Sequence, residues 1–272
     1  LARLVGEIAS RDGVVVAPLG VGENVLHEAP VGFAFALGPG RAAYVPFGHA
    51  GLSSHPQLGR EAVIESIATL LGVGRWGGTE TKATLALLGD SGREPAPPVW
   101  DAEIAGFLLD PAGTRGIVAL AAQHLGRRLR SWEEFAGRGA KAVSAADLPI
   151  ETTAVWAGEM ASAVAELAPL LLERLARDGI DALFRDVEMP LTAVLARMER
   201  AGVRVDEAAL RALSREYERE LLRLETEIHE LAGGPFQIAS PKQLQVVLFE
   251  KLKLPAVRKT KTGFSTDEAV LE

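Results

Sequence analysis

Apolar side chains recur at intervals of three and four residues in the segment from 206 to 232. On an α-helix this spacing places them on one stripe, and charged residues fill the other faces. Asp206 is suited to cap the N-terminus of such a helix, and Gly233–Gly234–Pro235 to end it. We expect a helix of roughly 40 Å that packs along its stripe. The stripe consists of Leu210, Leu213, Tyr217, Leu221, Leu224, Ile228 and Leu231.

Two further helix starts are predicted after this long helix. Ser240 is a good N-cap, Pro241 suits the first helical position, and Gln243 completes a capping box. Ser265 and Glu268 repeat the same signature. Free amides at helix N-termini, beside basic and hydroxyl side chains, can hold phosphates. A solvated connector with ordinary caps is the alternative interpretation.

The first part of the chain has a different pattern, in which short apolar runs alternate with helical periodicity. Strands are expected at 13–17, 31–38, 41–48 and 73–76, with a hairpin turn at Gly38–Pro39–Gly40. Helices are expected at 61–71, 82–89, 117–126 and 148–178, and a polar loop at 133–142. This order predicts an α/β domain. The domain boundary is expected between 178 and 186.

Composition narrows the possible classes of protein. The chain has 272 residues, of which 48% are hydrophobic and 24% charged, enough apolar material for one or two folded domains. It has no cysteine, which excludes disulfides and thiolate zinc sites. Its net charge of −7 argues against a general nucleic-acid coat. Positive charge is nevertheless concentrated between Lys242 and Lys261. No apolar run approaches the roughly 20 residues of a membrane span.

Four phrases in the last third of the chain carry a resemblance to a known family. EMPLTAVLARMERAGVRVD, SPKQL, LFEKLKLP and KTKTGFST, in this order, resemble the start of the polymerase region in family A DNA polymerases of the bacterial polymerase I type. The resemblance covers residues 186–272. It implies that 181–272 begin the polymerase domain with a partial α-helical thumb that grips primer–template duplex. Residues 1–180 then correspond to the 3′–5′ exonuclease domain, with a ribonuclease H-like (DnaQ-like) fold.

Exonucleases of this family hold two metal ions with four carboxylates on three motifs. By position, Ala17 and Leu19 replace the Asp and Glu of the first motif. Thr84 replaces the Asp of the second motif, or Ala83 if the alignment moves by one residue. Ser162 replaces the Asp of the third motif. The resemblance therefore predicts a vestigial, inactive domain that binds no metal.

One acid and one aromatic residue near these motifs require separate interpretation. Asp101 matches an Asp that the family keeps beside the site, although a role at a strand end or as a helix cap is preferred. Trp156 stands at the family's Tyr in the third motif. An active nuclease with relocated carboxylates, drawn from Glu23, Asp101 and Glu159, is the competing hypothesis. A non-catalytic DNA-binding module is the third.

Partners and cofactors follow from the resemblance. The chain is expected to be a monomeric, cytoplasmic, nucleoid-associated fragment that contacts the palm and fingers and no membrane. It needs no cofactor itself, whereas the whole polymerase uses Mg²⁺. Because Leu1 is not a natural start, we expect a piece of a longer protein. The predicted phosphate contacts are Lys242, Arg258, Lys259, Thr260, Lys261, Thr262, Ser265 and Thr266.

Overall fold

The structure is a computed structural model, and it divides into two compact units, Leu1–Gly202 and Val203–Glu272. It describes residues 2–9, 13–20, 30–38, 40–51, 56–93, 95–255, 258–260, 263–267 and 270. The first unit is mixed α/β, as expected. By compactness the chain divides after Gly202, because the helix α9 (Met189–Ala201) packs against α3 (Thr81–Leu88). The boundary between an exonuclease-like domain (1–180) and the start of a polymerase domain (181–272) stays a prediction.

A five-stranded sheet forms the centre of the first unit. Its strand order is β3-β2-β1-β4-β5. The first three strands are antiparallel neighbours, whereas β4 runs parallel to β1 and β5 parallel to β4. The four predicted strands are therefore present, with β4 slightly later than expected and β5 added. The bounds are β1 (Val14–Leu19), β2 (Gly32–Gly38), β3 (Arg41–Pro46), β4 (Trp76–Gly78) and β5 (Trp100–Asp101).

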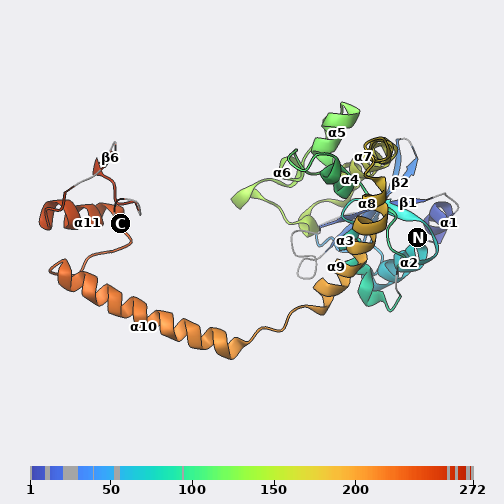
Figure 1. Ribbon diagram of the computed structural model, residues 1–272. Helices are drawn as coiled ribbons and strands as arrows, with labels where there is room; N and C mark the ends of the chain where they lie inside the picture. Colours follow the sequence, from blue (N-terminus) through green and yellow to red (C-terminus); the bar gives the residue numbers. More distant parts are fainter. Residues whose placement is uncertain are drawn as a thin grey trace. The chain divides into compact units, whose positions relative to one another are not determined.

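Helices cover both faces of this sheet (Figure 1). Side chains alternate along β1, so Val14 and Val16 join one core while Ala17 and Leu19 join the other. The first core packs against α1 (Ala2–Ala9), α2 (Arg60–Val73), α3 and α9. The second packs against α4 (Ala102–Leu109), α5 (Ile117–Leu125) and α7 (Ile150–Arg177).

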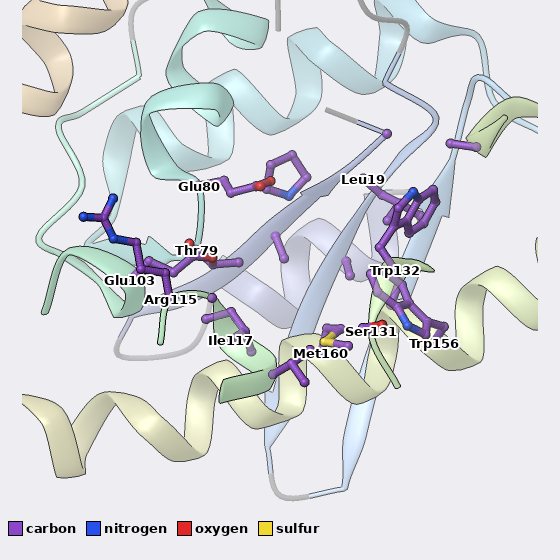
Figure 2. A pocket seen from close by; sticks show the side chains of 18 of the residues that line it. Leu19, Thr79, Glu80, Glu103, Arg115, Ile117, Ser131, Trp132, Trp156 and Met160 are labelled. Atoms are coloured by element: carbon purple, nitrogen blue, oxygen red, sulfur yellow. The ribbon is translucent and has the colours of Figure 1, made fainter. Parts of the chain in front are cut away.

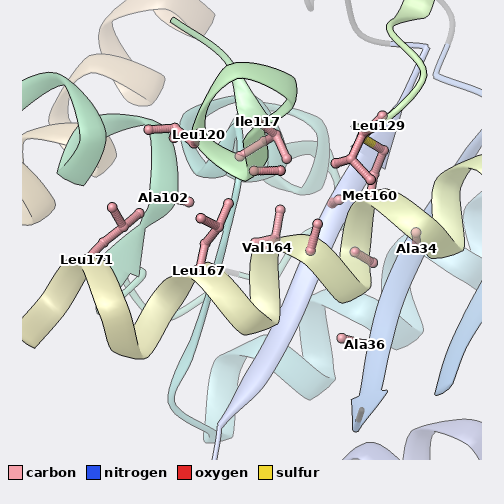
Figure 3. Close-up of a cluster of buried hydrophobic side chains, with 14 of the residues drawn as sticks. Ala34, Ala36, Ala102, Ile117, Leu120, Leu129, Met160, Val164, Leu167 and Leu171 are labelled. Carbon is pink, nitrogen blue, oxygen red and sulfur yellow. The ribbon is translucent and has the colours of Figure 1, made fainter. Parts of the chain in front are cut away.

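The helix α7 is the main support of the second core. Val164, Leu167 and Leu171 lie on one face of α7 and are at most 1% exposed. Figure 3 shows them against Ala102 and Ile117 of the neighbouring elements. Among the described helices, α7 alone has the length and composition of a possible membrane span. Half of its most apolar stretch is buried inside the unit.

The segment predicted as a loop at 133–142 is partly helical. The helix α6 (Trp132–Ala136) begins with a capping box in which Ser131 and Glu134 satisfy each other's backbone amides. Short 3₁₀ turns follow at Gly139–Lys141 and Ala145–Asp147, in addition to an earlier one at Gly89–Ser91. Further on, α8 (Asp181–Leu183) continues through a π turn at Phe184–Glu188 into α9.

The second unit begins with the predicted long helix. The helix α10 (Glu207–Leu231) is capped by Asp206, whose carboxylate accepts a hydrogen bond from the Ala209 amide. None of its residues is buried, and the apolar stripe that was expected to pack is exposed within this unit except for the half-buried Ile228. After it come α11 (Pro241–Gln245), a π turn at Val246–Lys251, and a hairpin of β6 (Lys259–Thr260) and β7 (Gly263–Phe264). Phe249 packs on Phe264 with ring centroids 5.2 Å apart, which joins the hairpin to the π turn.

Candidate functional site

A cavity of about 750 Å³ opens beside the C-terminal end of β1. Ala17 and Leu19, the residues at the first-motif positions, both line it and are buried. The alternation that places them in the second core also directs them toward α7, where Trp156 and Met160 complete the wall. The structure thus brings the first-motif positions and Trp156 to one cavity (Figure 2).

The other two positions assigned from the sequence do not line this cavity. Thr84 lies inside α3 and is fully buried, and its Oγ1 has no hydrogen-bond partner among the described residues. Ser162 is buried on α7 but outside the lining. Residues six apart on a helix face different sides, whereas residues four apart share a side. Met160, together with Ala157, therefore shares the cavity with Trp156 on α7.

Asp101 forms a structural junction, which confirms its interpretation as a strand-end and cap residue. It ends β5 and caps α4, and its Oδ1 accepts hydrogen bonds from the amides of Glu103 and Ile104 at 2.9 and 3.2 Å. Its Oδ2 accepts from the amide and the hydroxyl of Thr81, both at 2.9 Å. Burial raises the pKa of Asp101, and these four hydrogen bonds oppose that rise. Both oxygens are thus engaged in joining α3 to α4.

Glu103 is the half-buried acid of the cavity lining. The Thr79 hydroxyl donates a hydrogen bond to its Oε1 at 2.6 Å. Burial raises the pKa of Glu103, and the charge of Asp101 adds to the rise while the bond from Thr79 opposes it. Glu80, an exposed residue on the same wall, adopts a left-handed conformation with φ of 51°, which is uncommon for a residue with a side chain.

The opposite wall is aromatic. The Trp132 ring meets the Trp156 ring edge-on with centroids 5.2 Å apart. Phe135 stacks on Trp156 at 5.3 Å, and the Arg130 guanidinium lies 4.8 Å from the centre of the Phe135 ring. The Trp156 Nε1 donates a hydrogen bond to the Arg130 carbonyl at 2.8 Å. This wall is fixed by packing and by one partly buried hydrogen bond.

The residues at this cavity do not fit a divalent cation. Ala17 and Leu19 offer no side-chain oxygen, and Asp101 uses both of its oxygens in the fold. Of the relocated acids considered above, Glu159 is exposed and outside the lining, and Glu23 lies outside the described residues. Over the described ranges, no group of three acidic or histidine side chains is placed to hold a metal.

The predicted phosphate contacts lie in the second unit, around the hairpin. Lys242 and Arg258 are exposed. Lys259 and Thr260 form β6, whereas Lys261 and Thr262 lie outside the described residues. The hairpin therefore carries consecutive basic and hydroxyl residues, while Lys242 lies at the start of α11.

The caps in this unit differ in part from the prediction. Ser240 accepts from the Gln243 amide at 3.5 Å, as expected, but the Gln243 side chain accepts from the Gln237 amide instead of completing a capping box. Ser265 is only 3% exposed, and its Oγ accepts from the Asp267 amide at 3.3 Å. In this structure Ser265 supports the end of the hairpin, and Thr266 is half-buried.

Sequence reasoning missed Glu103, Thr79 and Met160 as residues of the first-unit cavity. Glu103 had a local signal in the sequence, because it follows the capping residue Asp101 by two positions. It therefore lies in the first turn of a helix, beside the end of the preceding strand. Thr79 and Trp132 carry no comparable local signal, because only the tertiary fold places them on this wall.

Comparisons with known proteins give consistent matches. The family model for DNA polymerase family A matches residues 207–272. The chain is 37% identical over 250 residues to a DNA polymerase I of Pseudomonas aeruginosa, covering 89% of this chain and 27% of that protein. It is 40% identical over 195 residues to a DNA polymerase I of Geobacillus stearothermophilus, covering 71% of this chain and 22% of that protein. The chain thus spans about a quarter of the length of these relatives.

A solved structure matches both units. It is the POL domain of Pol1 from M. smegmatis in complex with DNA primer-template and dNTP. The TM-score is 0.68 at 25% sequence identity, and the match covers 100% of this chain and 43% of that chain.

Proposed function

This chain belongs to DNA polymerase family A, and from that premise we propose that it serves template-directed DNA synthesis as a scaffold and duplex-gripping part of a polymerase I. In this proposal the first unit is an inactive exonuclease-like domain, and the second unit is the start of the thumb. Chemistry belongs to a palm with Mg²⁺, outside these 272 residues. The observation that carries the proposal is the cavity beside β1, where alanine and leucine occupy the positions that need carboxylates.

The sheet topology supports the ribonuclease H-like assignment of the first unit. Three antiparallel strands followed by two parallel ones, in the order β3-β2-β1-β4-β5, match the arrangement expected for that fold. Ala17 and Leu19 then stand at the end of the central strand, the place where such a nuclease carries its first metal ligands.

The loss of metal ligands supports the inactive state. Divalent cations such as Mg²⁺ need several oxygen ligands, and phosphodiester hydrolysis of this kind uses two ions. Ala17, Leu19 and Met160 supply none on their side of the cavity. The lining holds two acids, the exposed Glu80 and Glu103, which is already hydrogen-bonded to Thr79. Two carboxylates fall short of the four that the resemblance requires for a two-metal site.

The inactive state is tested with a 3′-labelled primer–template incubated with this chain in Mg²⁺ or Mn²⁺. We expect no metal-dependent shortening of the primer at protein concentrations that bind the duplex. A chelator reaction and a catalytically active exonuclease serve as the two controls. Shortening that the chelator abolishes would sink the proposal, and Glu103→Gln would then show whether this cavity is responsible.

The hairpin of the second unit supports a grip on duplex DNA. Lys242 and Arg258 are exposed, and Lys259 begins the hairpin strand β6. Basic side chains that contact phosphates fix the position of a duplex without reading its sequence. Each such contact releases counterions, so binding weakens steeply with salt. The solved relative named above is itself a complex with DNA primer-template.

The grip is tested in the longer polymerase that contains the palm. We expect Lys259→Ala with Lys261→Ala to weaken primer–template binding and to reduce the slope of log K against log salt by about 1.8, since two phosphate contacts are lost. The rate of nucleotide addition at saturating DNA should be unchanged. Arg128→Ala with Lys141→Ala removes the same charge from the first unit and is the matched control. Equal affinities at low and moderate salt would contradict the grip.

A further inference from the structure

The cavity beside β1 is large enough to hold more than water. Its volume of about 750 Å³ lies within the range of small-molecule sites, roughly 300–1,000 Å³. Most of its lining is apolar, including Leu19, Ile117, Trp132, Trp156 and Met160. Such a lining favours an organic ligand with a sizeable apolar part.

Acidic residues outnumber basic residues in the lining of the cavity. Glu80 and Glu103 are acidic, and Arg115 is the one basic residue among the lining residues that the structure describes. The Arg115 guanidinium lies 5.0 Å from the centre of the Phe107 ring, a residue outside the lining. A phosphate group would meet two carboxylates here with no metal ion between them. The balance favours a cationic ligand over an anionic one.

The polar and aromatic parts of the wall are separated. Figure 2 shows Thr79, Glu103 and Arg115 on one side of the cavity, and Leu19, Trp132 and Trp156 on the other. Glu103 is half-buried, so its charge is less screened than that of a surface acid. An ammonium group can donate a strong hydrogen bond to such a carboxylate, and an aromatic ring can pack against the indoles.

We propose that this cavity binds a small aromatic ammonium ion, with its ring against Trp132 and Trp156 and its ammonium group directed at Glu103. This function goes beyond the scaffold role proposed above. It requires neither DNA nor a metal ion, so its test is independent of the polymerase and exonuclease assays. A nucleotide is excluded as the preferred ligand by the two acids of the lining.

Calorimetric titration of the whole chain without DNA or metal tests the proposal. The probes are 2-naphthylmethylammonium, its neutral analogue 2-naphthylmethanol, the anion 2-naphthoate, and dAMP. We expect the ammonium probe to bind about tenfold more tightly than the neutral probe, the value of one charged hydrogen bond. The naphthoate and dAMP should bind more weakly than either. Equal affinity for the anion and the cation, or no binding of the cation, would overturn the proposal.

Two variants assign the binding to this cavity. Glu103→Gln keeps an acceptor for the Thr79 hydroxyl and should remove the tenfold preference for the cation, with affinity for the neutral probe unchanged. Glu159→Gln removes an exposed acid of α7 outside the lining and should leave the preference intact. Ala17→Leu narrows the cavity at its β1 wall and should weaken both probes, and thermal melting checks that each variant folds. A preference that survives Glu103→Gln and Ala17→Leu would place the binding elsewhere and refute the site.

Discussion

At the scale of single residues, two acids close in sequence have different roles beside the first-unit cavity: Asp101 holds the fold together, and Glu103 lines the open space. Asp101 accepts four hydrogen bonds and is 2% exposed, so its charge is used entirely inside the protein. Glu103 has one described partner, Thr79, and remains on the wall of the cavity. Asp101 and Glu103 are only two positions apart, yet Asp101 is a structural residue and Glu103 can contact a ligand in the cavity.

Replacing Asp101 should therefore destabilise the first unit. Asp101→Ala removes a helix cap, which costs about 1 kcal/mol, and leaves the Thr81 donors buried without an acceptor, which costs about 1–3 kcal/mol more. We expect a loss of about 3 kcal/mol in chemical denaturation. Ser131→Ala removes the exposed cap of α6 in the same unit and should cost only about 1 kcal/mol. Similar losses for both variants would contradict the role of Asp101 as a junction.

The pKa of Glu103 predicts a pH dependence of stability. Its folded pKa is raised from 4.5, chiefly by burial, so the folded state holds this proton more tightly than the unfolded state does. The stabilisation from the proton is present below the unfolded pKa and is lost as pH rises through the folded pKa. Glu103→Gln should therefore gain stability relative to the native chain as pH rises above the unfolded value of 4.5 and through the raised folded pKa.

Denaturation of both proteins across this pH range measures that gain. Glu159→Gln changes the net charge equally at an exposed position and serves as the control. A difference between the native chain and Glu103→Gln that does not vary with pH would be incompatible with a buried, titrating carboxylate.

At the scale of elements, the approach of β4 to β1 depends on glycine. A Cβ on Gly78 would overlap the Val16 carbonyl oxygen, and one on Gly77 would overlap the Trp100 ring. The parallel pairing of β4 with β1 fixes the position of β1, which carries Ala17 and Leu19 on the wall of the cavity. Two glycines in β4 are thus a packing requirement of the sheet.

Gly78→Ala should destabilise the first unit by about 3 kcal/mol, because backbone atoms on both strands must move to admit the methyl group. Gly6→Ala makes the same chemical change on α1, where a Cβ would meet nothing within 4 Å. It should stabilise the protein by about 0.5–1 kcal/mol through helix propensity. Thermal melting of the two variants separates these outcomes, and a Gly78→Ala protein as stable as the native chain would exclude a close strand contact.

Elements with strong periodicity could be predicted from the sequence, and those without it could not. The stripe and cap of α10, the three first strands and the long α7 gave clear patterns. The five-residue helix α6 is too short for a periodic signal, and only its capping box marks it. Ala17, Leu19 and Trp156, which the sequence assigned to motif positions, line the cavity, whereas Thr79 and Trp132 reach it by tertiary contacts that no local pattern encodes.

At the scale of the whole molecule, the two units differ in how much of their structure is buried. The helix α7 buries twelve of its residues, whereas α10 buries none. Local stability follows buried apolar contacts, so regions without them open at low free-energy cost. The second unit should consequently be the less protected part of the chain.

Hydrogen exchange tests this difference in the 272-residue chain. We expect the amides of α10 to exchange at rates typical of easily opened segments, while those of α7 exchange through global unfolding. In a longer polymerase that covers the apolar stripe, α10 should become protected while α7 changes little. Equal protection of the two helices in this chain would mean that the stripe already has a cover.

The contact between Trp132 and Trp156 gives the cavity its own spectroscopic signal. Two indoles with centroids 5.2 Å apart and planes inclined by 69° are close enough for their electronic transitions to couple, and coupled transitions produce a paired positive and negative band in circular dichroism. Trp132→Phe removes this pair and leaves Trp76, Trp100 and Trp156, so the difference between the spectra of the two proteins isolates the signal. The intensity of this paired band then reports the packing of Trp132 on Trp156 during heating or titration, separately from the melting of the helices.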